Sequence, residues 1–200
     1  MHNLKKFLKL NMMIIITIIF TSCTNSKLNI PVLSKNKTYN INNINIHSPN
    51  EDLWRLLKNE KSDIVFAKYG SNKEDTYIAR VVMFELKNLN KNEFVKLIKN
   101  NLITNLDKKR YDLLKSDIKY YYKRKYPCVS SSVLLKDKIA KVRGGGTKEL
   151  LLDIKSLHCK DPSKINKGFM IVYSFRSLKN DINFNKKANS FISGVEVSNY

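Results

Sequence analysis

The chain has little cysteine, little arginine and no long apolar run. Three cysteines in 200 residues exclude the disulfide-dense scaffolds of very small secreted proteins. The most apolar stretch, residues 12–20, has nine residues and is interrupted by Thr17, which makes a membrane protein with several spans untenable. With 42% hydrophobic and 27% charged residues, the composition is that of a globular chain with one core.

Arginine is scarce within a strongly basic chain. Lysine and arginine total 37 against 17 acidic residues, a formal net charge of +20, but 31 of the 37 are lysine and six are arginine. Nucleic-acid sites favour arginine, whose planar fork bonds phosphate and guanine in two places. Asparagine is also abundant, at 24 residues, and a surplus of lysine and asparagine is what adenine-rich codons produce. Nucleic acid is therefore an unfavoured partner.

The N-terminus has the pattern of an export signal. Lys5, Lys6 and Lys9 give residues 1–11 a positive charge without any acid, and the apolar stretch 12–20 follows. Nine helical residues span about 14 Å, roughly half of a ~30 Å hydrocarbon core. We therefore expect residues 1–22 to form a cleavable signal peptide.

The residues after the apolar stretch resemble the lipobox of bacterial lipoprotein precursors. Thr21, Ser22 and Cys23 match the positions nearest the cleavage site, whereas Phe20 departs from the usual Leu, Val or Ile. The resemblance implies cleavage before Cys23, acylation of its thiol with palmitate-type chains, and a location in the bacterial cell envelope. Thr24 in place of Asp implies sorting to the outer membrane. The alternative is an ordinary secretory signal with an incidental Cys23.

The mature chain is expected to be a short tether followed by one domain. Residues 23–47 are rich in Asn, Ser and Lys and contain no acid, which predicts a flexible tether. The alternative is a first edge strand built on Ile41, Ile44 and Ile46. Residues 48–200 are expected to form a single α+β domain, with a mostly antiparallel sheet and two or three helices.

Local patterns place most elements of this domain. Ser48, Pro49 and Glu51 predict a helix start, with apolar residues continuing to about Glu60. A second helix is expected from Asn90, because Glu93 three residues later completes a capping box. The other expected elements are a β-hairpin (64–69 and 77–84), strands at 128–135, 150–159 and 168–177, turns at 144–146 and 161–162, an ambiguous helix or strand at 107–125, and a last helix or strand within 184–197.

Cys128 and Cys159 form the best candidate pair. Both fall in expected strands around a hairpin turn, and export favours oxidation, so we expect a disulfide. Closing a loop of this size stabilises the fold by roughly 3–4 kcal/mol. A zinc site with His158 is the rival, but neighbouring residues of a strand point to opposite faces and a fourth ligand is missing. We expect no metal and no cofactor.

A basic and aromatic segment, residues 119–126, is the candidate binding surface. Alternating lysine and tyrosine side chains suit stacking and contacts to anions. The alternative is that the tyrosines fill the core while the lysines remain solvated. The candidate anion-binding residues are Lys119, Tyr120, Tyr122, Lys123, Arg124 and Lys125.

Catalytic signals are weak. Residues 143–148 contain three glycines but not the order of a phosphate loop, and residues 130–132 lack the context of a serine nucleophile. His158 is the candidate general base of the domain, without an identified partner. The C-terminal half resembles small envelope lipoproteins with no assigned activity, through Cys159 to Pro162 and Tyr173 to Arg176. Arg176 is expected to pair with a carboxylate or with carbonyl groups.

These observations favour a lipid-anchored, non-catalytic binding or accessory protein of the cell envelope. Its expected partners are the membrane, through Cys23, and an anionic envelope polymer or an acidic protein. One alternative is an envelope hydrolase acting on cell-wall glycan or lipid. The other is a periplasmic inhibitor or immunity-type protein with an acidic partner.

Overall fold

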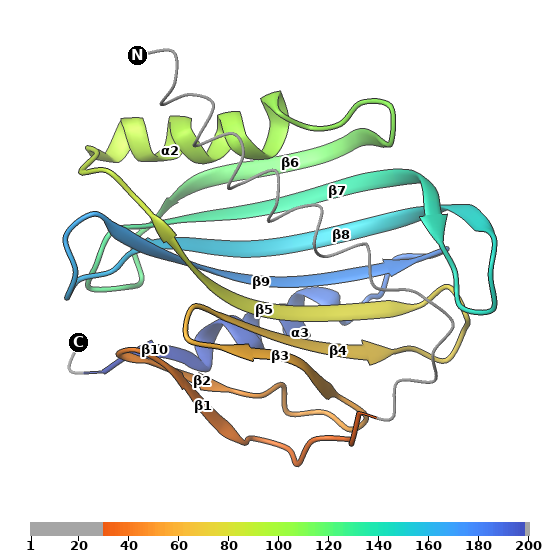
Figure 1. Cartoon of the computed structure of the whole chain (residues 1–200). Helices are drawn as coiled ribbons and strands as arrows, with labels where there is room; N and C mark the ends of the chain where they lie inside the picture. The colour runs from red at the N-terminus through yellow and green to blue at the C-terminus, as the bar shows by residue number, and fades with distance from the viewer. Residues whose placement is uncertain (1–29, 199–200) are drawn as a thin grey trace.

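The computed structural model describes residues 30–198, which form two antiparallel sheets and two α-helices in one domain. The large sheet has seven strands in the order β3-β4-β5-β9-β8-β7-β6, and the small sheet has three in the order β1-β2-β10 (Figure 1). The large sheet comprises β3 (Arg55–Glu60), β4 (Asp63–Tyr69), β5 (Thr76–Glu85), β6 (Tyr111–Tyr121), β7 (Cys128–Lys141), β8 (Thr147–Lys160) and β9 (Lys167–Ser177). The remaining elements are β1 (Thr38–Ile41), β2 (Ile44–His47), β10 (Val195–Val197), α2 (Lys91–Lys99), the π-helical turn η1 (Asn100–Thr104) and α3 (Phe184–Ser193).

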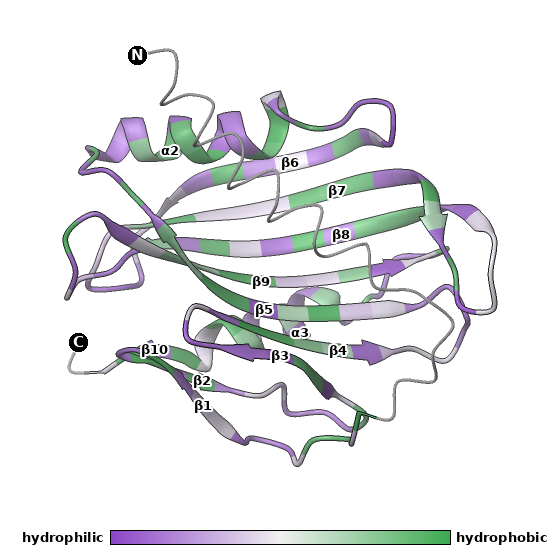
Figure 2. Ribbon diagram, in the orientation of Figure 1, coloured by the Kyte–Doolittle hydropathy of each residue, from purple (hydrophilic) through white to green (hydrophobic). Residues whose placement is uncertain are grey.

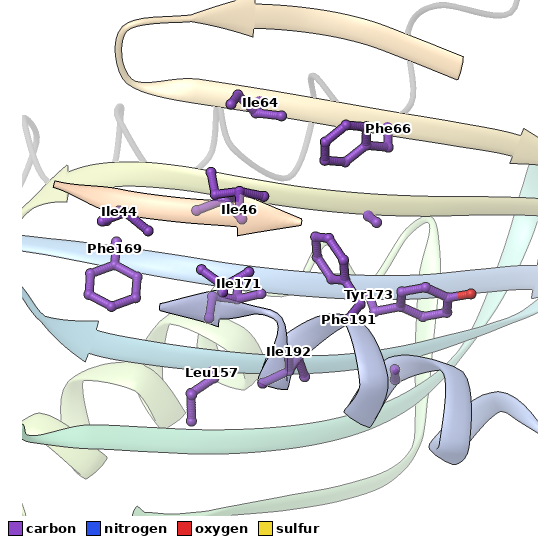
Figure 3. Packing of buried hydrophobic residues seen from close by; sticks show 14 of the residues in the cluster. Ile44, Ile46, Ile64, Phe66, Leu157, Phe169, Ile171, Tyr173, Phe191 and Ile192 are labelled. Carbon is purple, nitrogen blue, oxygen red and sulfur yellow. The ribbon is translucent and has the colours of Figure 1, made fainter. Parts of the chain in front are cut away.

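The main core lies between one face of the large sheet and a layer made of the small sheet and α3. Ile44 and Ile46 of β2, Ile171 of β9 and Phe191 of α3 belong to this core, and Figure 3 shows their side chains converging there. The other face of the large sheet is partly covered by α2, where Phe94 and other apolar residues pack on β6 and β7. Figure 2 shows the corresponding alternation of hydrophilic and hydrophobic residues along α2. The large sheet is therefore covered by α3 on one face and by α2 on the other.

Most of the expected elements are present. The hairpin of β4 and β5 is confirmed, and β5 is central because it pairs with β4 on one side and with β9 on the other. The helix after Asn90 is confirmed with its capping box: Asn90 Oδ1 accepts from the Glu93 backbone N–H at 3.0 Å, and Glu93 Oε2 accepts from the Asn90 N–H at 2.8 Å. The glycine turn is also confirmed, since Gly144, Gly145 and Gly146 have φ values between 79° and 99°.

The structure decides both ambiguous segments. Residues 111–121 form strand β6, which pairs with β7 along its whole length. The segment 184–197, expected to be a helix or a strand, contains both: α3 ends at Ser193, and β10 begins at Val195. Neither outcome is visible in local propensity alone, since a partner strand supplies the hydrogen bonds that make the strand form favourable.

The prediction of a tether is wrong for residues 38–47. β1 and β2 form a hairpin whose Ile41, Ile44 and Ile46 side chains have no solvent exposure. β2 also pairs with β10, so it is the central strand of the small sheet and more than the edge strand considered as the alternative. The domain therefore begins before residue 48, because this polar-looking segment contributes alternate isoleucines to the core.

The prediction of a helix from Ser48 to Glu60 is also wrong. Ser48 is not a helix N-cap, because its Oγ accepts from the Lys37 backbone N–H at 2.9 Å. Leu53 adopts a left-handed φ of 69°, which a helix does not contain. The chain then enters β3, which pairs with β4. The apolar spacing suits a helix, but an isolated helix of this length is only marginally stable, whereas β3 gains hydrogen bonds from its ladder with β4.

Two buried carboxylates of the large sheet, those of Asp63 and Asp137, are paired with arginines. Arg80 donates to both carboxylate oxygens of Asp63 at 2.7 and 2.8 Å. Asp137, which is fully buried, accepts two bonds from Arg110 at 3.0 Å, and Arg176 Nη1 lies 3.6 Å from its Oδ2. The expected carboxylate partner of Arg176 is thus confirmed. The pair links β7 to β9 near the ends of the two strands.

The disulfide between Cys128 and Cys159 is confirmed. The two residues are directly opposite each other on β7 and β8, with a Cα–Cα distance of 4.1 Å. The zinc alternative is wrong, since Cys159 is bonded to Cys128 and its side chain lies in the main core, whereas His158 points to the opposite face. No helix in the described part of the chain has the length and hydrophobicity that crossing a membrane requires.

Replacing both cysteines by alanine is expected to lower the free energy of unfolding by about 3–4 kcal/mol, because the crosslink restricts the unfolded chain across a separation of 31 residues. Urea unfolding of the native and double-variant chains measures this difference. A thiol count on the denatured, unreduced native chain is the control and should detect neither Cys128 nor Cys159. Two reactive thiols from these positions would contradict the bridge.

Candidate functional site

The residues of the 119–126 segment do not form one surface. Tyr120 and Tyr122 lie on the side of α2, with ring centroids 4.9 Å apart and Lys91 Nζ 5.0 and 4.5 Å from the two centroids. Lys119 points to the opposite face and pairs with Asp117 at 2.6 Å. The alternation of a strand therefore separates residues that are neighbours in the sequence.

The rest of the segment is divided between structural and solvated residues. Arg124 donates to the carbonyl oxygen of Ile192 at 2.9 Å, near the end of α3. Lys123 and Lys125 are exposed. An anion-binding role for this segment stays a prediction. The surface that could serve it is smaller than the sequence suggested, because the segment is divided between two faces. Cys23, the predicted acylation site, lies outside the described residues.

His158 is part of a buried polar chain. Its Nε2 lies 2.9 Å from Ser156 Oγ, which in turn lies 2.5 Å from Ser131 Oγ. All three residues are buried on the face of the large sheet opposite the main core. Burial lowers the pKa of His158 to about 4, so its imidazole is neutral near pH 7. Within residues 30–198 no group of three or more His, Cys, Asp or Glu residues is placed to hold a metal ion.

A groove beside α3 is the strongest candidate site in the described structure. It has a volume of about 720 Å³ and runs between α3 and the segment that follows β2. We call it the α3 groove. The residues that line it are Asn36, His47, Ser48, Pro49, Asn50, Glu51, Tyr173, Asn183, Lys186, Lys187, Ser190, Phe191 and Gly194.

Tyr173 forms the floor of the α3 groove. Its ring is held by Trp54, Phe184 and Phe191, with centroid distances of 5.8 to 6.1 Å. The residue is 1% exposed, yet its hydroxyl has no hydrogen-bond partner. Burial raises the pKa of the phenol, and the Glu51 carboxylate raises it further. A buried hydroxyl without a partner costs folding energy, so the site is poised to gain a hydrogen bond from a ligand.

The first turn of α3 brings positive potential to the groove. Its N-cap residue Asn183 makes no side-chain capping bond, and the turn contains no acidic residue. Lys186 and Lys187 follow, and Lys187 pairs with Asp181 at 2.7 Å. The N–H groups of Asn183 and Phe184 already donate to Asp181, at 2.8 and 3.0 Å, so Lys186 is the group of this turn that favours acceptor atoms on a ligand.

Glu51 is the carboxylate among the described residues that line the groove, and it is already paired. Lys68 Nζ bonds Glu51 Oε2, and the same ammonium lies 5.7 Å from the Trp54 ring and 5.2 Å from the Tyr77 ring. Tyr77 Oη donates to Asp181 Oδ2 at 3.1 Å, and burial raises the pKa of Tyr77 to about 12. This cluster of aromatic rings and paired charges fixes the wall of the groove behind Tyr173.

The arrangement suits binding of a polar ligand. Amide, hydroxyl and ammonium groups line the groove, while the apolar rings of Tyr173 and Phe191 form its base. Sequence reasoning missed this site because Asn36 and His47 fell in the expected tether and Glu51 in the expected helix. The signal that was available is the pair Lys186 and Lys187 in a helix start without acids, which locates only one side of the groove.

Comparisons with known proteins assign the chain to no family. No family model and no curated protein matches the sequence. The PsbP protein of the cyanobacterium Synechocystis sp. PCC 6803 (CyanoP) is 12% identical, with a TM-score of 0.45 over 88% of this chain and 97% of its own. The Saccharomyces cerevisiae Ran-binding protein Mog1p is 10% identical, with a TM-score of 0.44 over 82% and 96%. These likenesses carry no functional assignment.

The buried histidine predicts a loss of stability in acid. The native pKa of about 4 lies below the unfolded value of 6.5, so the unfolded state binds the proton first as the pH falls. The stabilisation is complete above about pH 6.5 and is lost as the pH falls towards 4, by up to about 3 kcal/mol. Urea unfolding measured across this range should show the loss, and His158→Gln should reduce it.

Asp153 supplies a control with the opposite sign. Burial raises its pKa from 3.8 to about 6, so its native carboxyl group holds a proton that the unfolded one has released. Its ionisation therefore lowers stability as the pH rises from about 4 to 6. Asp153→Asn should make the acid loss steeper. If Asp153→Asn flattens the profile instead, this assignment is wrong.

Proposed function

We propose that this chain is a lipid-anchored protein of the bacterial cell envelope that binds a polar ligand in the α3 groove and performs no chemistry on it. The observation that carries the binding role is the Tyr173 hydroxyl, which is buried without a partner at the floor of the α3 groove, a cavity of about 720 Å³. Ligand sites are typically preformed hollows with an apolar base and a few placed polar groups.

The contents of the groove favour binding over hydrolysis. Glycoside hydrolysis needs two carboxyl groups on either side of a bond, whereas Glu51 is the lining carboxylate in the described structure and is paired with Lys68. His158, the candidate base, lies on the opposite face of the large sheet and is buried. His47 and Ser48 also line the groove, but each is bonded elsewhere: His47 Nδ1 lies 3.0 Å from Thr38 Oγ1, and Ser48 Oγ accepts from the Lys37 backbone N–H at 2.9 Å.

The proposed anchor is Cys23, seven residues before the first described residue, Ile30. Each acyl chain contributes about 0.8 kcal/mol for every CH₂ group buried in the membrane, so two or three chains hold a protein almost permanently. With residues 1–22 removed, the chain has a net charge of +17, which favours an anionic envelope partner.

Acylation of Cys23 can be tested in cells that express the full chain. We expect the native chain to incorporate labelled palmitate and to fractionate with membranes, and Cys23→Ser to lose both properties because the acylated thiol is absent. Ser22→Ala is the matched control, since it keeps the thiol and a small residue before it. Palmitate incorporation by Cys23→Ser would contradict the proposal.

Occupation of the groove can be tested with variants of neighbouring residues on α3. Ser190 is exposed and lines the groove, so Ser190→Trp should fill it, whereas Asn189→Trp adds the same side chain on an exposed residue outside it. The measurement is a pull-down from envelope extract at two salt concentrations. Material that binds the native chain should be lost with Ser190→Trp and kept with Asn189→Trp. Equal retention by all three chains would place the binding surface elsewhere.

Tyr173→Phe refines the same test. It removes the hydroxyl that lacks a partner, so the unliganded chain should gain about 1 kcal/mol of stability while ligand retention falls. Thermal unfolding measures the first effect and the retention assay the second. A destabilised variant would mean that the hydroxyl already makes a favourable bond within the protein.

A further inference from the structure

Exposed apolar side chains gather at one end of the domain. Leu53 is 62% exposed, Leu178 54%, Ile182 96% and Val32 47%. Single exposed apolar residues are common, but a group of them at one place marks an interaction site. At the opposite end, the loop between β8 and β9 carries Ile165, which is 90% exposed.

Contacts in the core show that these residues share one end. Trp54, next to Leu53, packs on Tyr77 with a centroid distance of 6.4 Å, and Tyr77 Oη reaches Asp181, next to Ile182, at 3.1 Å. Val32 forms a bridge with Arg55 at the start of β3. In Figure 1 this is the right-hand end, where the arrows of β4 and β9 terminate. We call it the anchor-side end.

The chain enters the domain at this end. Arg55 Nη1 donates to the carbonyl oxygen of Ile30, and the Leu33 N–H donates to the Trp54 carbonyl oxygen at 2.8 Å. Ile30 lies seven residue steps after Cys23. At 3.3–3.6 Å per residue they span at most about 25 Å, so a lipid on Cys23 keeps the anchor-side end close to the membrane.

Three lysines lie at the same end of the large sheet. Lys73, Lys141 and Lys179 are exposed and form no ion pair within residues 30–198. Lys73 lies in the loop after β4, Lys141 is the last residue of β7 before its loop, and Lys179 lies in the loop after β9. Arg143 ties two of these loops together, because its N–H donates to the Lys73 carbonyl oxygen at 3.2 Å and its Nη2 to that of Asn72 at 2.6 Å. Lysines beside apolar side chains suit an anionic membrane surface.

We propose that the anchor-side end docks on an anionic lipid surface, with Leu53, Leu178 and Ile182 entering the interfacial region and Lys73, Lys141 and Lys179 meeting lipid phosphates. The proposal rests on the proposed anchor at Cys23 for its orientation, and it adds a contact that the anchor alone does not require. The protein is then held with a defined face to the membrane.

A fluorescent probe at each end of the domain tests this docking. Ile182→Cys carries a polarity-sensitive dye at the anchor-side end, and Ile165→Cys carries it at the opposite end as the matched control. Cys128 and Cys159 are bonded to each other, so the introduced thiol is the reactive one once Cys23 is acylated or replaced by serine. The full chain is bound to vesicles of phosphatidylglycerol and phosphatidylethanolamine that contain spin-labelled lipid.

We expect a blue shift and strong quenching for the dye at position 182 and neither effect at position 165. In the Cys23→Ser background, vesicle binding should fall about tenfold or more when Leu53 and Ile182 are both changed to serine, because their apolar burial is lost. Binding should also weaken in neutral phosphatidylcholine vesicles and in high salt.

Three outcomes would overturn the proposal. The first is equal quenching at both positions, and the second is an aqueous spectrum at position 182 in the vesicle-bound, acylated chain. The third is a blue shift at position 182 that grows with protein concentration before lipid is added, which would assign this end to a second copy of the chain. Mass spectrometry of Cys23 reports the anchor separately, so a failed anchor and a failed docking surface are told apart.

Discussion

The pairing of β2 with β10 is the constraint on which the rest of the domain depends. It joins residues 44–46, near the start of the described chain, to residues 195–197, near its end. The small sheet that results covers one face of the large sheet together with α3, and the isoleucines of β2 have no solvent exposure there. Because α3 leads directly into β10, this pairing also fixes the helix that forms one wall of the α3 groove.

The alternation of side chains along the large sheet distributes its chemistry between two faces. Cys159 and Tyr173 point into the main core, whereas His158 and Arg176 point to the other face. Tyr173 can therefore lie under α3 and still form the floor of a groove, while the polar chain from His158 to Ser131 is kept apart from it. The same geometric rule therefore places the groove and the histidine on opposite faces of the large sheet.

The α3 groove begins near the anchor-side end of the domain. The segment from Ile30 and the exposed Leu53 and Ile182 lie at the end that a lipid on Cys23 would hold near the membrane. The α3 groove begins near the same end, at Glu51 and Asn183, and continues along α3 to Gly194. With the proposed anchor in place, a ligand in the groove would therefore lie within reach of the membrane surface.

Local chemistry made several elements predictable from the sequence alone. The capping box at Asn90, the hairpin around residues 70–75 and the pairing of Cys128 with Cys159 depend on residues near one another in the chain or on one strand pair. Residues 38–47 and 48–60 were not predictable in this way, because their strands exist through partners far away in the sequence, and the α3 groove joins His47 to Lys187 for the same reason. The sequence by itself determined the charge and the local turns and caps, and it predicts an export-type N-terminus. Only the tertiary structure decided which polar segment belongs to the core and where a cavity forms, since both depend on long-range packing that no local pattern records.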